Sequence, residues 1–154
     1  METEFKAAKK LDEKFDFAGP DRNLGLLYLE APSIGSIGSR SKARTHLQRA
    51  VDLAPEFPDN RLNHAEAHIR WKESEAARKD VEALDAALPK AREQFSGDSW
   101  AGAWKDWERR LNKLREQLKS PVKKATSPKG TPVCAMPKGP GFMPRKTTRL
   151  VPLP

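Results

Sequence analysis

A chain of 154 residues with 37% hydrophobic residues, one tyrosine and six phenylalanines has room for one modest domain with a small helical core. It contains no apolar run of membrane-spanning length, and its first ten residues, METEFKAAKK, lack the apolar stretch of a signal peptide. The one cysteine, Cys134, excludes an internal disulfide and a cysteine-based zinc knuckle.

The charge is unevenly divided along the chain. All 21 acidic residues lie within residues 1–118, together with 21 of the 29 lysines and arginines. Residues 119–154 hold the other eight cations, no acid and eight of the 13 prolines. The net charge of +8 therefore belongs to the C-terminal segment, while the remainder is neutral.

Residues 1–18 are expected to form the second half of a helical unit. Phe5 and Ala8 precede the letters LDEKFD with the spacing that Leu47 and Ala50 have ahead of LAPEFP. The chain is thus expected to begin inside a repeated unit, and a longer N-terminus would supply the missing half.

Residues 19–57 and 58–91 are predicted to be two helix–turn–helix units. Their first helices are expected over residues 21–30 and 59–71, and Ser39 or Ser41 is expected to cap the second helix of the first unit. Each second helix has small or apolar residues on one face and is expected to end at a proline. Four positions recur at an offset of 34 residues, Ala43, Leu47, Ala50 and Pro55 matching Ala77, Val81, Leu84 and Pro89.

This pattern resembles the tetratricopeptide repeat, a helical hairpin of 34 residues. The resemblance implies an all-α, antiparallel hairpin stack, or α-solenoid, over residues 1–95. Two features depart from the family pattern: the turn APSIGSIGSRS is about six residues longer than usual, and His64, Ala65 and His68 replace the usual Leu, Gly and Tyr. The residues that match the family pattern are Leu24, Gly25, Tyr28, Ala43, Leu47, Ala50 and Pro55.

The letters GPDRNLGLLYLEAP and LAPEFPDNRLNHAEAH are also similar to a bacterial subfamily, the T component of TRAP transporters (TatT-like proteins). Those are periplasmic tetratricopeptide lipoproteins regarded as partners of a solute-binding protein, so the resemblance implies a transporter-associated role. This sequence has no lipobox or export signal. The cytoplasm is therefore expected for the chain as given, and the periplasm if its N-terminus is truncated.

Residues 96–118 are predicted to form a tryptophan-rich helix that caps the stack. Ser96 is expected to be its N-cap, with Asp98 in the first turn, where a negative charge suits the helix dipole. The leucine half of its apolar stripe is expected to run past the last hairpin or to pair with another helix, which leaves a homo-oligomer open. The stripe consists of Trp100, Trp104, Trp107, Leu111, Leu114 and Leu118.

The pair His64 and His68 lies on one helix face, a spacing able to bind a metal, with Glu66 between them and His46 on the preceding helix. The pattern lacks the glutamate directly after the first histidine that zincin metalloproteases require. A half-buried, hydrogen-bonded histidine pair is therefore the preferred interpretation, with no metal, no cofactor and no catalytic residue. Cys134 lies in a segment not expected to form a pocket, and no G-x-S-x-G motif occurs.

The predicted function is a non-catalytic protein–protein interaction scaffold. The first helices of successive repeats line a concave groove, which is expected to bind a protein or peptide partner. The predicted contact residues are Arg22, Leu26, Leu29, Glu30, Asp59, Leu62, Glu66, Ile69 and Arg70.

The proline-rich segment 119–154 is expected to be a disordered basic tail, because it has few large apolar residues to bury. Cations without acids bind polyanions, so the alternative function is binding of nucleic acid or an anionic membrane through the tail. The cations named for this role are Lys123, Lys124, Lys129, Lys138, Arg145, Lys146 and Arg149.

Overall fold

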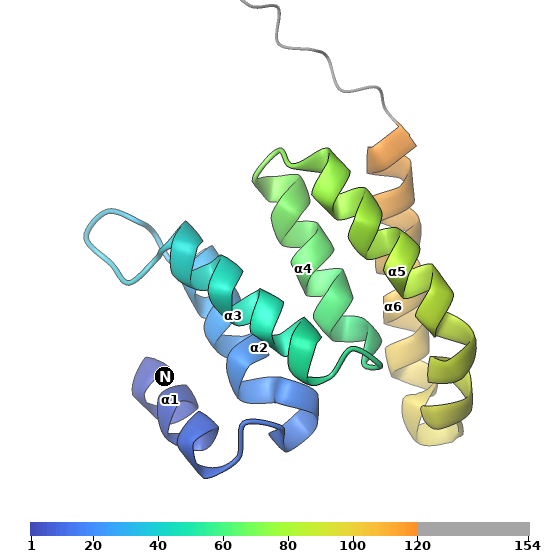
Figure 1. The fold of residues 1–154 in the computed structure, drawn as a ribbon, viewed down its shortest axis with the longest axis horizontal. Helices are drawn as coiled ribbons and strands as arrows, with labels where there is room; N and C mark the ends of the chain where they lie inside the picture. The colour runs from blue at the N-terminus through green and yellow to red at the C-terminus, as the bar shows by residue number, and fades with distance from the viewer. Residues whose placement is uncertain (120–154) are drawn as a thin grey trace, which may run out of the picture. The chain divides into compact units, whose positions relative to one another are not determined.

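Residues 1–119 are described in a computed structural model of the chain, where they form six helices (Figure 1). No strand occurs in this range, so the all-helical class is confirmed. Among these helices none is long and apolar enough to cross a membrane. The predicted tail lies outside the described residues, except for Lys119, which ends the last helix. The helices are α1 (Glu2–Leu11), α2 (Phe15–Glu30), α3 (Arg40–Leu53), α4 (Pro58–Arg70), α5 (Ser74–Gln94) and α6 (Asp98–Lys119).

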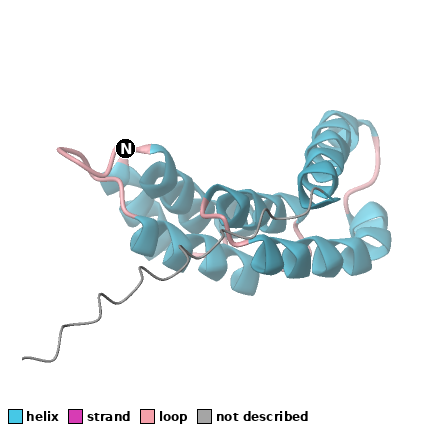
Figure 2. Ribbon diagram, turned by 90° about the horizontal axis from the view of Figure 1, so that it is seen from above, coloured by secondary structure: helices cyan, strands magenta, loops and turns pink. Residues whose placement is uncertain are grey.

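Consecutive helices pack in pairs, α2 against α3 and α4 against α5 (Figure 1). Helix α1 packs on α2, and α6 packs on both α4 and α5. Helix α4 is central, because it contacts α2, α3, α5 and α6. Seen from above, loops join the helices of this range, and the longest is residues 31–39 between α2 and α3 (Figure 2).

Local signals in the sequence set several helix ends. The Ser39 hydroxyl accepts a hydrogen bond from a backbone N–H of the first turn of α3 at 3.3 Å, which confirms it as the N-cap. Helix α3 ends two residues before Pro55, as predicted. Helix α4 begins with Pro58, whose missing N–H would have no partner within a helix at this position, and carries Asp59 in its first turn.

The prediction that Pro89 ends its helix is wrong, because α5 continues through it to Gln94. Within a helix, a proline removes the hydrogen bond to the carbonyl four residues earlier, here that of Asp85. Both residues are exposed, so the freed carbonyl lies on the solvent side. Beyond Pro89, Ala91 and Phe95 are buried in the core, and their burial favours continuation of the helix.

The start of α2 has an unusual backbone. Asp16, Phe17 and Ala18 have φ values of 49°, 52° and 63°, the left-handed region that costs energy for residues other than glycine. Two buried side chains hold this turn. The Arg22 guanidinium donates to the carbonyls of Asp16 and Phe17 at 3.2 and 3.3 Å, and the Asn60 amide donates to the Phe17 carbonyl at 3.0 Å.

The apolar core has two parts. A small cluster joins α2 and α3 around Leu24, Tyr28 and Ala43, with Phe5 of α1 packed against it. A larger cluster spans α4, α5 and α6 and includes the whole predicted stripe of α6. The tryptophan half and the leucine half of that stripe therefore both pack within this chain. The helix itself begins at Asp98, directly after Gly97, so the expectation that Ser96 is its N-cap is wrong by one residue.

Candidate functional site

The nine residues predicted to contact a partner differ widely in exposure. Arg22 and Leu62 are buried, Leu62 completely, so they contribute to the interior. Leu26, Leu29, Asp59, Glu66 and Ile69 are half-buried, and Glu30 and Arg70 are exposed. Glu30 and Arg70 form an ion pair that joins the ends of α2 and α4.

An arginine of α6 pairs with two of these residues. Arg110 binds the Glu66 carboxylate through two hydrogen bonds of 2.9 and 2.8 Å, and it also contacts Asp59 and Asn63. Burial alone would lower the pKa of the guanidinium, but the hydrogen bonds and attraction from Glu66 and Asp59 raise it above its ordinary value. The two carboxylates are therefore neutralised within the chain and are less available to a partner.

A cleft of about 290 Å³ lies between α4 and α6. Glu66, Ile69 and Arg70 line it from α4, so three of the nine predicted contact residues share one open surface. From α6 it is lined by Lys113, Leu114 and Gln117. The surface combines apolar side chains with charged ones, the composition that protein and peptide interfaces use.

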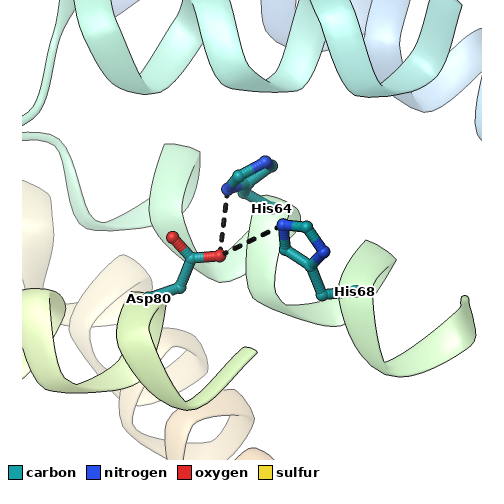
Figure 3. Close-up of side chains that lie close together, drawn as sticks. All are labelled: His64, His68 and Asp80. Atoms are coloured by element: carbon teal, nitrogen blue, oxygen red, sulfur yellow. Dashed lines mark ion pairs between the residues drawn. The ribbon is translucent and has the colours of Figure 1, made fainter. Parts of the chain in front are cut away.

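A cluster of histidines and one carboxylate lies on the other side of α4, against α5 (Figure 3). His64 and His68 project from α4 toward Asp80 of α5, and the three residues are 4%, 6% and 8% exposed, so the histidines are buried and not half-buried as expected. His64 Nδ1 lies 2.9 Å from Asp80 Oδ2, and His68 Nε2 lies 3.7 Å from the same oxygen. One ligand-type atom from each residue lies within 4.8 Å of the others.

The two other residues considered beside the histidines are placed elsewhere. Glu66 turns to Arg110, and His46 pairs with the fully buried Asp21 at 2.7 Å. The third member of the cluster, Asp80, was not recognised from the sequence. A signal was present, because Asp80 lies three residues after Ala77 and four before Leu84, on the buried face of its helix.

Glu73, in the turn before α5, fixes the orientation of one imidazole. Its carboxylate lies 2.7 Å from His68 Nδ1 and accepts hydrogen bonds of 2.6 Å from both Arg40 and Arg44. The hydrogen bonds from Arg44 and His68 lower the pKa of Glu73 to about 2. The ionised carboxylate thus accepts from Nδ1, which leaves Nε2 of His68 facing Asp80.

The seven cations named for polyanion binding lie outside the described residues. No family model matches the chain, and a search of curated proteins finds no significant relative.

Proposed function

We propose that this chain is a non-catalytic interaction module of the tetratricopeptide type, which binds a segment of a partner protein along α2, α4 and α6. The main support for this proposal is the cleft between α4 and α6, where Glu66, Ile69 and Arg70 line one surface. In a stack of helical hairpins, the first helix of each unit lines the same face. Contacts of α4 with both α2 and α6 are consistent with that arrangement.

The lining of the cleft suggests the chemistry of the partner. Ile69 and Leu114 offer an apolar floor, and Arg70 and Lys113 are exposed cations at its rim. Because Arg110 pairs with Glu66 and Glu30 pairs with Arg70, the unpaired charge of the cleft is the positive charge of Lys113. The bound segment should therefore carry an apolar side chain beside an acidic one. A transporter-associated partner, as in TatT-like proteins, is one protein of this kind.

A displayed peptide library tests the proposal with purified full chain as bait. Selected peptides should share an apolar residue next to Asp or Glu, and Lys113→Glu should weaken their binding about tenfold or more. The matched control is Lys105→Glu, an exposed lysine of α6 that does not line the cleft. Failure to select peptides, or equal binding by both variants, would refute the proposed groove.

A second candidate function is polyanion binding by the C-terminal cations, favoured by eight lysines and arginines without an acid in residues 119–154. Binding of duplex DNA by the full chain should then fall steeply with salt. Replacing the seven named cations by glutamine should abolish it, while Lys105→Gln should leave it unchanged. DNA binding that survives the sevenfold replacement would reject this candidate.

A further inference from the structure

We propose that His64, His68 and Asp80 form a zinc site that joins α4 to α5. All three residue types are Zn²⁺ ligands, and one potential ligand atom from each lies within 4.8 Å of the others (Figure 3). The inference is independent of the cleft between α4 and α6, because the histidines meet Asp80 on the side of α4 that packs on α5.

The spacing of the ligand atoms fits a tetrahedral metal. Zinc bonds of about 2.0–2.1 Å at tetrahedral angles place two ligand atoms roughly 3.3 Å apart. Asp80 Oδ2 lies 2.9 Å from His64 Nδ1 and 3.7 Å from His68 Nε2, so the two observed separations bracket that value. Small side-chain rotations would equalise them around one ion.

The same atoms lack hydrogen-bond partners. Six buried side-chain nitrogen and oxygen atoms are unpartnered in the described part of the chain, and three belong to this cluster: both ring nitrogens of His64 and Oδ2 of Asp80. Although His64 Nδ1 and Asp80 Oδ2 are 2.9 Å apart, their geometry does not make a hydrogen bond. An unpaired buried polar group destabilises the fold, and a shared metal ion would give both His64 Nδ1 and Asp80 Oδ2 a partner.

The surroundings of the cluster also match a metal site. Histidine ligands commonly donate their second ring N–H to a carboxylate, which fixes the ring orientation. Glu73 accepts from His68 Nδ1 at 2.7 Å and is itself held by Arg40 and Arg44. Arg61 approaches the other carboxylate oxygen of Asp80, Oδ1, at 3.9 Å, so Oδ2 remains available to the metal.

The ligand set selects the class of metal. Two imidazoles and one carboxylate favour Zn²⁺ over Mg²⁺ and Ca²⁺, which prefer oxygen ligands throughout. Three protein ligands leave a fourth position of the tetrahedron for water. Because the ligands come from two helices, the ion would stabilise the packing of α5 on α4.

Zinc titration of the full chain, purified without a histidine tag and stripped with a chelator, tests the proposal. In competition with a chromophoric chelator, the protein should bind one equivalent of Zn²⁺, and Mg²⁺ should not displace it. Co²⁺ should give the intense visible absorption of a tetrahedral site. Asp80→Asn should weaken zinc binding at least about 100-fold. Loss of a ligand should exceed the 10–100-fold effect of losing a residue that only hydrogen-bonds to a ligand. Asp85→Asn, an exposed aspartate of the same helix, is the matched control.

Two further variants separate ligation from folding. His64→Leu places an apolar side chain at a buried position, so it should keep the helical circular dichroism spectrum and lose the cobalt spectrum. Replacing His46, the histidine outside the cluster, by glutamine should leave one equivalent bound. The proposal is overturned if the wild type binds no stoichiometric zinc, if folded His64→Leu still binds it, or if the Asp85 and His46 variants lose binding equally.

Discussion

Close approach of α2 and α3 can be tested at Gly25. A Cβ atom built on this glycine would lie 2.7 Å from Cγ and 2.8 Å from Cδ2 of Leu47, and 3.0 Å from the backbone nitrogen of Leu47. Leu47 is fully buried, so its side chain has little room to move away. Alanine at Gly25 would improve helix propensity by about 1 kcal/mol, but overpacking costs about 1–3 kcal/mol. Gly25→Ala should therefore lower the free energy of unfolding by up to about 2 kcal/mol.

The control is a second helical glycine with open surroundings. A Cβ on Gly102 of α6 would meet nothing within 4 Å, so Gly102→Ala should stabilise the chain by about 1 kcal/mol. Urea unfolding followed by circular dichroism gives the free energy of unfolding of both variants, and in thermal unfolding each 1 kcal/mol should shift Tm by about 4 °C. If Gly25→Ala proves as stabilising as Gly102→Ala, the inferred packing of α2 on α3 is incorrect.

Three other substitutions probe the charged groups. Arg110→Leu should lower the free energy of unfolding by about 2 kcal/mol, because Glu66 loses its cation and Asp59 keeps only its 3.6 Å contact with Arg22. Arg109→Leu, at an exposed position, should change it by less than about 0.5 kcal/mol; urea unfolding compares them. Asp21→Ala should cost about 3 kcal/mol in the same assay, since the fully buried Asp21 carboxylate contacts Lys9, Arg49 and the His46 imidazole, and a neutral result would contradict its role. Because the pKa of Glu73 is lowered from 4.5 to about 2, its stabilising effect is present above pH 4.5 and is lost as the pH falls toward 2. In metal-free protein, Glu73→Gln should flatten this part of the pH–stability curve and Glu75→Gln should not.

Features that depend on neighbouring residues could be predicted from the sequence. The Ser39 cap, the end of α3 before Pro55 and the apolar stripe of α6 follow from short-range spacing alone. Pro89 misled the prediction because a proline's effect depends on which side of the helix it lies. Pro89 lies on the exposed side of α5, so the loss of its backbone hydrogen bond is offset by the burial of Phe95 on the side that faces the core.

The ion pairs and the histidine cluster depend on packing between distant segments. Arg110 meets Asp59 and Glu66 across 51 and 44 residues of sequence, so no local pattern links them. The histidine pair was recognisable at its spacing of four, but its carboxylate partner lies on another helix. Asp80 could have been identified as a charged residue on a buried helix face, an uncommon position for an unpaired carboxylate.

Helix α4 links the two proposed sites. Its residues alternate between them: His64 and His68 face α5, while Glu66 and Ile69 line the cleft toward α6. With neighbours on several sides, the helix cannot shift against α5 without disturbing its other contacts. Ordering the histidine side of α4 would therefore also restrict the positions of Glu66 and Ile69. In the two proposals, zinc and a partner would each contact a different side of this helix, and each proposal is tested by its own variants.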